Sequence, residues 1–401
     1  MKRFGQIVLI ILFIGIIISI PVLTRIEKNQ VISQFENRKL AERPILTKST
    51  LISGEYFGKW ENYLSDHIFG RNLWIQGYTY MNMAVLGKSN INNIVIGNDG
   101  FLLPFFPYDG KQEQKNSERN LEAMSRQLKE LQDKLAQYGG SFYFAGIPSQ
   151  ASYHREDYPK HLQSLNEFMG KTEKLFFDKL DKLGVSYINM NTIFRRNAEA
   201  EYFYKTDHHF NLEGAYTTYY EIIKNIRQGS GEIIAPPLEK SELDIITLPN
   251  PFGGSRNRQI YYMQPTEEHI QLAYPKHKTA YEKYVNGKAD NTLYYIKDDT
   301  SAMITYSVYM GGDWAETLIK TNNDKLPNLL VFGDSFTNAI EPLLFQHFNE
   351  TRILDLRYYT KMSLYEYIDK YKPDVVLMVR DDLNYGSLEG NGGFKGENVK
   401  K

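Results

Sequence analysis

The chain has 401 residues and a formal net charge of −1, with 42% hydrophobic and 24% charged residues. This balance is typical of a globular protein, and it lacks the strong basic excess that nucleic-acid-binding proteins usually carry. The sequence has no cysteine, which excludes disulfide bonds, thiol catalysis and cysteine-ligated zinc. We therefore expect a folded body with no nucleic-acid partner.

An apolar segment near the N-terminus predicts a membrane anchor. Lys2 and Arg3 precede a run from Ile7 to Leu23 that is interrupted only by one glycine, one serine and one proline. This length is near the minimum for a helix that crosses a bilayer. A cleaved signal peptide would have a shorter apolar core and a small-x-small cleavage site, which the run lacks. We predict that residues 1–28 form a single-pass signal anchor in the cell membrane, with the body outside the cytoplasm.

The next part of the chain leads into the main domain. Residues 29–60 are polar, and we predict an extended stalk there, followed by a domain over residues 61–385. Asp66-His67 is close in sequence to Arg71, a grouping that favours a structural polar cluster over a catalytic pair. Two apolar runs flank Asn98-Asp99-Gly100 and predict a hairpin.

Helical and strand patterns then alternate. Apolar residues at three- and four-residue steps from Leu121 to Leu135 predict an amphipathic helix. Strands are predicted over residues 142–147 and 185–190, with a second helix between them. This alternation predicts an α/β fold in which helices cover both faces of a parallel sheet. Because ligands in such folds bind beyond the carboxyl ends of strands, the loop 148–150 is expected to line the site.

The pattern is interrupted once before it resumes. Between residues 229 and 325, prolines, glycines and short apolar runs predict a β-rich insertion. Strands are predicted again over residues 329–332, 353–356 and 375–379, with helices from residue 337 and over residues 364–371. The glycine-rich, charged end, residues 386–401, is predicted to be disordered.

Ser335 is a candidate nucleophile because of its position. It lies in a Gly-Asp-Ser sequence directly after a predicted buried strand and just before a predicted helix. The strand would hold Ser335 rigidly, Gly333 would let the backbone bend sharply, and the helix N-terminus would offer free N–H groups to an oxyanion. The tripeptide by itself is a weak signal.

The sequence Asp207-x-His209 supplies the other groups that acyl transfer from an ester needs, a base and a residue that orients it. In extended backbone, residues two apart point to the same side, so Asp207 could reach one nitrogen of His209 while the other faces Ser335. His208 would then point away. Two other interpretations stay open: a metal half-site, for which no further cluster has convincing spacing, and a polar turn that caps a helix. We predict no metal and no cofactor.

The two motifs together resemble the SGNH hydrolase superfamily. Ordinary members carry Gly-Asp-Ser early and Asp-x-x-His late, whereas here the Asp-His pair comes first. This inverted order is similar to the alginate O-acetyltransferase-like branch, and most of all to the Gram-positive DHHW protein family, with Phe210 in place of that family's tryptophan. Further matches, spread from about Glu36 to Tyr385, are Gly97–Leu102, Gly214–Tyr216, Gly311-Gly312, Asp334–Asn338, Pro342 and Asp355–Tyr359.

The resemblance implies a membrane-anchored, SGNH-like three-layer domain with a circularly permuted motif order, outside a Gram-positive cell. Ser335 would be the nucleophile, His209 the general base and Asp207 the residue that orients it. The Ser335 backbone N–H is the expected oxyanion donor, and the Asn338 side chain and a backbone N–H of Gly311 or Gly312 are further candidates. Arg380 would bind an acidic sugar or, more simply, pair with Asp381.

The resemblance also implies an activity. Such proteins add acetyl groups to exported polysaccharides, and a multi-spanning membrane-bound O-acyltransferase hands them the acetyl group. We therefore expect an O-acetyltransferase that acts on a cell-surface polysaccharide or exopolysaccharide through an acetyl-serine intermediate. The alternatives are a carbohydrate acetylesterase with the same triad, a non-catalytic polysaccharide-binding or assembly protein, and a role in teichoic-acid esterification.

Overall fold

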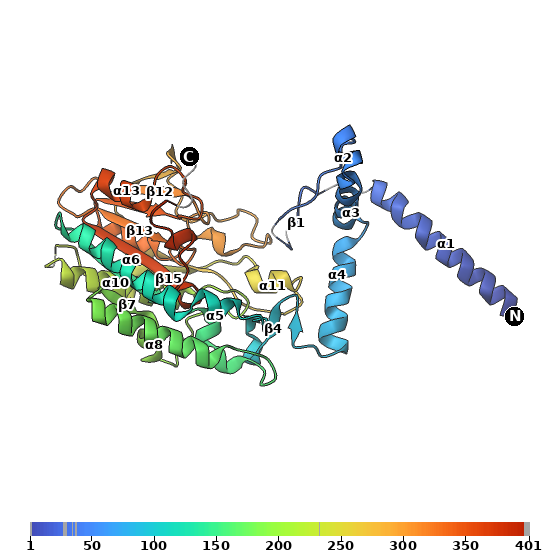
Figure 1. Ribbon diagram of the computed structural model, residues 1–401, viewed down its shortest axis with the longest axis horizontal. Helices are drawn as coiled ribbons and strands as arrows, with labels where there is room; N and C mark the ends of the chain where they lie inside the picture. Colours follow the sequence, from blue (N-terminus) through green and yellow to red (C-terminus); the bar gives the residue numbers. More distant parts are fainter. Residues whose placement is uncertain (1, 27–29, 34, 37, 232, 397–401) are drawn as a thin grey trace. The chain divides into compact units, whose positions relative to one another are not determined.

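The computed structural model describes residues 2–26, 30–33, 35–36, 38–231 and 233–396 (Figure 1). The chain forms two compact units. The N-terminal unit comprises Met1–Asn92 and Asn257–Gln264, and the main unit comprises Asn93–Arg256 and Pro265–Lys401.

The N-terminal unit begins with the apolar helix α1 (Lys2–Ile26). Its residues Phe4–Ile26 are long and apolar enough to cross a membrane, and none of them is buried in the protein. A signal sequence would pass the same test of length and composition. The expected apolar helix is therefore present, and its length and composition fit either a membrane anchor or a signal sequence.

The segment expected to be an extended stalk is partly helical. Helix α2 (Lys48–Ile52) begins at a capping box, in which the Thr47 and Thr50 side chains each bond the other's backbone N–H. Helices α3 (Glu55–His67) and α4 (Arg71–Tyr80) follow. Local side-chain capping thus favours helix at α2, where the polar composition suggested extended chain. Helices α3 and α4 begin after Gly54 and Gly70 without a side-chain cap.

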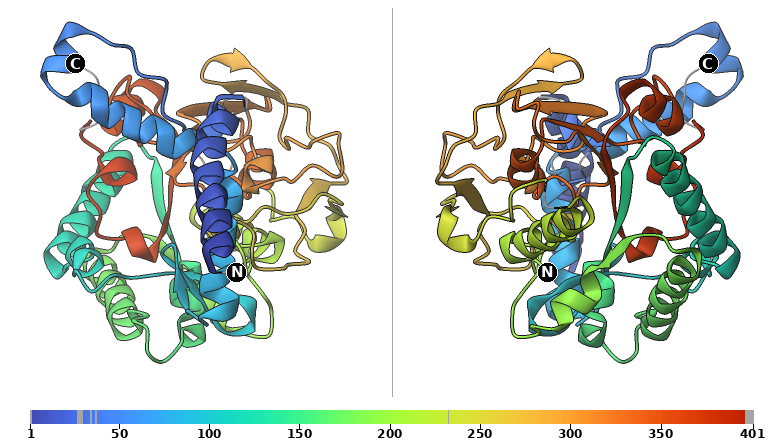
Figure 2. Two further views of the ribbon diagram at one scale, coloured as in Figure 1. Left: turned by 90° about the vertical axis from the view of Figure 1, so that its right-hand side faces the viewer. Right: turned by 90° about the vertical axis from the view of Figure 1, so that its left-hand side faces the viewer.

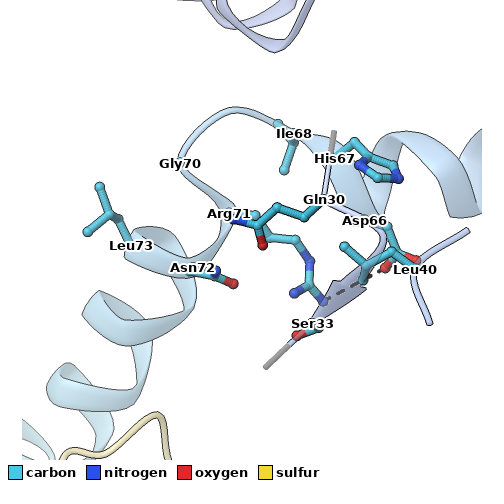
Figure 3. A pocket seen from close by; sticks show the side chains of 10 residues that line it. All are labelled: Gln30, Ser33, Leu40, Asp66, His67, Ile68, Gly70, Arg71, Asn72 and Leu73. Atoms are coloured by element: carbon cyan, nitrogen blue, oxygen red, sulfur yellow. Dashed lines mark ion pairs between the residues drawn. The ribbon is translucent and has the colours of Figure 1, made fainter. Parts of the chain in front are cut away.

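Asp66 lies at a small pocket of about 180 Å³ in the N-terminal unit (Figure 3). Its carboxylate accepts hydrogen bonds from Arg38 Nη1 at 2.8 Å and from the Ala41 N–H at 2.8 Å. The hydrogen bond from Arg38 lowers the pKa of Asp66 to about 2. His67 Nε2 lies 2.9 Å from the Ala41 carbonyl oxygen. These contacts are those of a structural polar cluster.

The main unit is built around one large sheet. Its eight described strands have the order β11-β10-β12-β14-β13-β15-β6-β7. Five strands are parallel: β14 (Glu350–Leu354), β13 (Leu329–Gly333), β15 (Val375–Asp381), β6 (Ser141–Ile147) and β7 (Tyr187–Asn189). Every residue of β13 and β15 is buried, as expected for central strands of a parallel sheet.

Helices cover both faces of this sheet (Figures 1 and 2). On one face, α6 (Glu118–Ala136), α8 (Asn166–Leu183) and α13 (Leu364–Tyr371) share a core with alternate strand residues such as Leu330 and Phe332. On the other face, α9 (Met190–Arg195) and α10 (Leu212–Gly229) share a core with Leu329 and Val331. The predicted three-layer α/β fold is confirmed.

The sheet is mixed rather than wholly parallel. Strands β10 (Glu282–Val285), β11 (Lys288–Ala289) and β12 (Glu316–Lys320) are antiparallel and extend it at one side, where β12 pairs with β14. All three come from residues 229–325. The same stretch forms a separate ladder of β8 (Leu243–Thr247) and β9 (Gln271–Pro275). Part of the predicted insertion therefore belongs to the central sheet.

Short elements complete the main unit. The predicted hairpin is present as β4 (Ile94–Ile96) paired antiparallel with β5 (Leu102–Pro104). The remaining short α-helices of the main unit are α5 (Lys111–Lys115), α7 (Gln150–Tyr153) and α12 (Glu341–Leu344). Helix α11 (Ser255–Gln259) begins in the main unit and continues into the residues Asn257–Gln264 of the N-terminal unit.

The glycine-rich end, which we expected to be disordered, is folded over residues 386–396; residues 397–401 lie outside the described residues. We call residues 386–396 the C-terminal segment. Phe394 is fully buried and packs edge-on against Phe332 of β13, with ring centroids 5.5 Å apart. Composition suggested disorder because the segment has few apolar residues, but one well-placed aromatic ring anchors it to the sheet.

Candidate active site

Ser335 follows β13 at the carboxyl ends of the parallel strands. The backbone of Gly333 has no positive φ. A glycine is needed there because the backbone of β15 is close, and a Cβ would lie 2.5 Å from the Val379 carbonyl oxygen. The expected sharp bend at this glycine is therefore wrong. The glycine lets two central strands pack closely at the point where the serine emerges.

The chain after Ser335 forms turns and not the expected helix from residue 337. Two hydrogen bonds join residues three apart, as in turns. The Thr337 N–H donates to the Asp334 carbonyl at 3.0 Å, and the Asn338 N–H donates to the Ser335 carbonyl at 3.3 Å. Helix α12 begins only at Glu341, and Pro342 sits in its first turn, where a proline is best tolerated. Among the described residues, the Ser335 N–H has no hydrogen-bond acceptor.

Asp207 and His209 lie in a bent loop rather than in the extended backbone that we expected. A bridge between Phe203 and Phe210 closes this loop. The Asp207 Oδ1 atom accepts from the His209 N–H at 3.0 Å and lies 2.6 Å from His209 Nδ1. The bend brings the two side chains together through the backbone N–H, as in an Asx turn.

His209 joins Asp207 to Ser335. Its Nε2 atom lies 2.6 Å from Ser335 Oγ, within hydrogen-bond reach. The Tyr306 ring stacks on the imidazole, with ring centroids 3.8 Å apart and planes 4° from parallel. Asp207, His209 and Ser335 therefore form one hydrogen-bonded chain whose imidazole orientation is held on two sides.

His208 does not point away from this chain. Its ring centroid is 3.7 Å from that of His209, and its Nδ1 atom lies 2.7 Å from Ser255 Oγ. The expectation failed because it assumed extended backbone. Distance, and not strand alternation, distinguishes His209 from its neighbour.

Asp207 is fully charged in this environment. Burial by itself would raise its pKa, but His209, His208 and the Ser255 N–H, at 2.7 Å from Oδ2, outweigh burial and hold the pKa well below its usual value. A charged carboxylate at Nδ1 keeps the proton on that nitrogen. The Nε2 atom is then free to accept the Ser335 proton.

Ser335 opens into a cavity of about 560 Å³. His208 and Arg380 line it too, as do Ser149 and Gln150 from the loop expected beside the site. The strands β6, β13 and β15 all end at this cavity. This position matches the general rule for ligand sites in parallel sheets.

The other candidates are placed differently. The Asn338 amide donates to Asp313 Oδ1 at 2.9 Å, so it is engaged in a structural contact. Gly311 and Gly312 have φ of +83° and +97° and do not line the cavity. Arg380 lines the cavity, and among the described residues it forms no ion pair with Asp381 within 4.0 Å.

Three residues of the site were missed by the sequence analysis: Ser255, Tyr306 and Glu268. Glu268 accepts from the Lys205 and Thr206 N–H groups at 2.5 and 3.0 Å and so fixes the loop that carries Asp207. The only local signal was Gly253-Gly254 before Ser255. A Cβ at Gly254 would lie 2.3 Å from the Thr206 carbonyl oxygen.

The metal half-site interpretation has a geometric basis, because ligand atoms of Asp207, His208 and His209 lie within 4.8 Å of one another. However, both oxygens of Asp207 already accept hydrogen bonds, and both ring nitrogens of His209 are engaged. The donor set is thus arranged as a hydrogen-bonded relay.

The main unit has an SGNH-like α/β fold, and comparisons with known proteins agree with this fold. Residues 94–248, which include Asp207 and His209, match the family model "SGNH hydrolase-like domain, acetyltransferase AlgX". No curated protein matches the sequence. The resemblance to the alginate O-acetyltransferase-like branch is confirmed.

Solved structures extend the match to most of the chain. A structure of Bacillus cereus PatB1 is 27% identical with a TM-score of 0.62, and covers 75% of this chain and 99% of its own. A structure of PatB1 with a sulfonyl adduct is 25% identical, with a TM-score of 0.61 and the same coverage. A DHHW family protein from Eubacterium siraeum is 19% identical with a TM-score of 0.58, covers 78% of this chain and 98% of its own, and shows the shared fold. Together these findings support an acyl-transfer enzyme.

Proposed function

We propose that this protein is an O-acetyltransferase that acetylates a hydroxyl group of an exported cell-surface polysaccharide or exopolysaccharide through acetyl-Ser335. The observation that carries the proposal is the relay from Asp207 through His209 to Ser335, with 2.6 Å at each of its two imidazole contacts. The similarity of residues 94–248 to an acetyltransferase domain supports the choice of an acetyl group.

In the first half-reaction, His209 Nε2 takes the proton of Ser335 as Oγ attacks the acetyl carbonyl carbon of the donor. The carbonyl oxygen becomes an oxyanion beside the Ser335 N–H, which has no other acceptor among the described residues. His209 then gives its proton to the leaving group. Acetyl-Ser335 remains.

The second half-reaction repeats these steps with the glycan. The acceptor hydroxyl loses its proton to His209 and attacks the acetyl carbon, and Ser335 Oγ leaves with the proton from His209. In both half-reactions Asp207 accepts a hydrogen bond from His209 Nδ1–H and stabilises the imidazolium. We propose that a membrane-bound O-acyltransferase supplies the acetyl group. We also propose that α1 is a membrane anchor that keeps the main unit outside the cytoplasm.

The test uses the full-length, detergent-solubilised protein with 4-nitrophenyl acetate, with and without oligosaccharide acceptors. Mass spectrometry is expected to detect acetyl-Ser335 and an acetylated oligosaccharide. Ser335→Ala removes the nucleophile and should lower turnover by about a thousandfold or more. Ser241→Ala, at an exposed serine, is the matched control and should leave turnover unchanged.

The outcomes separate the candidate functions. Acetyl-Ser335 that transfers only to water would identify an acetylesterase. If no acetyl-enzyme forms and no ester is hydrolysed, the protein is a non-catalytic binding or assembly protein. Because PatB1 is known with a sulfonyl adduct, a sulfonyl fluoride is a second probe, and the adduct is expected on Ser335.

A further inference from the structure

Two buried arginines line the same cavity as Ser335. Arg380 is at the end of β15 and is 4% exposed, and Arg256 is in α11 and is 8% exposed. They come from segments far apart in the sequence. A buried guanidinium normally has a carboxylate partner, so the partners of these two residues are informative.

Arg380 has no such partner. Its Nη1 atom is buried without a hydrogen bond, and within the described ranges no carboxylate oxygen lies within 4.0 Å of the guanidinium. The neighbouring carboxylate of Asp381 is turned to other donors, the Leu383 N–H at 3.0 Å and Asn384 Nδ2 at 2.5 Å. Burial lowers the pKa of Arg380 only to about 10, so it stays charged at neutral pH.

Arg256 is held in place by a neutral side chain and not by an ion pair. Its Nε atom donates to Gln150 Oε1 at 2.9 Å, and Gln150 in turn donates to the Tyr204 carbonyl at 2.6 Å. In the part of the chain that the structure describes, no carboxylate lies within 4.0 Å of Arg256. Burial lowers its pKa to about 10, which again leaves it charged.

The nearby carboxylates act on these two arginines only from beyond ion-pair distance. Against the effect of burial, Asp381 and Asp334 raise the pKa of Arg380, and Asp207 raises that of Arg256, but none of them lies within 4.0 Å of the guanidinium it affects. Arg357 is the contrast: it pairs with Asp355 at 2.5 Å and with Asp313 at 2.8 Å. Burial and nearby Asp381 raise the pKa of Asp334 well above its usual value and so disfavour its charged form. Glu389, the other acidic residue of the lining, is exposed.

Two buried guanidinium groups that form no ion pair within the described residues, beside a candidate nucleophile, make a poor structural element but a good receptor for an anion. Arginine binds carboxylate and phosphate oxygens through paired N–H groups, and these bonds are strong where water is excluded. We propose that Arg256 and Arg380 form an anion subsite that binds a carboxylate or phosphate group of the acceptor glycan. This proposal rests on the proposed function, because that function makes a glycan the acceptor, and it adds the chemical class of the group that the acceptor carries.

The test measures binding to the full-length Ser335→Ala variant by calorimetry, so that no turnover occurs. Trigalacturonic acid supplies a carboxylate, its methyl ester is the uncharged match, and oligo(glycerol phosphate) supplies a phosphate. We expect one anionic probe to bind at least about tenfold more tightly than the methyl ester, since each lost charge-assisted hydrogen bond weakens binding by about this factor. The tighter of the two identifies the source of the anion.

Arg256→Gln and Arg380→Gln, in the same background, should each remove about tenfold of the affinity for the preferred anion and leave methyl ester binding within about twofold. Arg126→Gln is the matched control, because the Arg126 side chain is 69% exposed and pairs with Glu122 on the surface of α6. Thermal melting of each variant reports whether the fold is kept.

Equal binding of the charged and methylated probes to the Ser335→Ala protein would overturn the subsite, whatever the arginine variants do. So would arginine variants that melt normally and still prefer the anion. Failure of acetyl transfer is a separate result: if the anionic probe binds through both arginines but is never acetylated, the proposed function fails and the subsite stands.

Discussion

At the residue scale, Asp207 is the best-defined member of the proposed triad, because each of its oxygens has a defined partner. Oδ1 faces His209 Nδ1, and Oδ2 accepts from the Ser255 N–H. An imidazole with this partner and with Tyr306 against its face has little freedom to rotate. The active conformation is therefore built before any substrate arrives.

Asp207→Asn is expected to lower kcat by about 10³- to 10⁴-fold, because an amide can also turn its NH₂ group to His209 and favour the wrong tautomer. Acyl-enzyme formation from 4-nitrophenyl acetate measures the effect. Asp244→Asn, at an exposed position on β8, is the control. Full activity in the Asp207→Asn variant would contradict the role assigned to the carboxylate.

At the scale of elements, the C-terminal segment joins two strand ends beside the candidate nucleophile. Asn391 Nδ2 donates to the Gly333 carbonyl at 2.7 Å, and its Oδ1 accepts from the Leu356 N–H at 2.6 Å. Asn391 thereby links the end of β13 to the chain after β14. The turn that carries Ser335 begins at this link.

Asn391→Ala is expected to reduce kcat more than it changes KM, because the freed Gly333 carbonyl loosens the turn that positions Ser335. Two buried backbone groups lose their partners, so the free energy of unfolding should fall by about 1–3 kcal/mol for each. Steady-state kinetics and chemical denaturation measure the two effects.

Asn349→Ala is the matched control for this prediction. Asn349 Nδ2 donates to Asn328 Oδ1 at 3.0 Å, just before β13 begins and therefore at the opposite end of the strand from Ser335. Its loss should lower stability and leave kcat unchanged. If both variants lower kcat in proportion to their stability, Asn391 has only a structural role.

At the scale of the whole molecule, the proposed location outside the cytoplasm depends on the apolar helix α1. No residue of Phe4–Ile26 is buried in the protein, so this apolar helix is available to a membrane. Thr24 near its end accepts a hydrogen bond from the Phe69 N–H at 2.9 Å within the N-terminal unit.

Deletion of residues 2–19 keeps Thr24 and is expected to move the protein from the carbonate-resistant membrane fraction to the soluble fraction. Hydrolysis of 4-nitrophenyl acetate per molecule should stay within about twofold, because the deleted residues bury nothing. Mass spectrometry of the full-length protein from cells checks the anchor itself. A mature N-terminus beyond residue 20 would identify a cleaved signal sequence and contradict the anchor.

Much of this protein could be predicted from local sequence. Periodicity located α6, α13, β6, β13 and β15, because these elements bury one face or all of their residues and need a fixed pattern of apolar side chains. Ser335, His209 and Asp207 could be proposed as a triad because short motifs carry recognisable chemistry, and the structure brings their side chains into contact. Strand order was beyond reach, since antiparallel β12 pairs with β14 across a long separation in sequence.

The sequence by itself determined which groups can do chemistry and which segments are strands or helices, because both depend on neighbours along the chain. Only the tertiary structure decided which residues meet at Ser335. It folded the glycine-rich end against the sheet, where Asn391 donates a hydrogen bond to the Gly333 carbonyl. It left Arg256 and Arg380 without carboxylate partners in the described chain, beside the cavity. Pairing between distant residues depends on the packing of the whole sheet, and no local pattern encodes it.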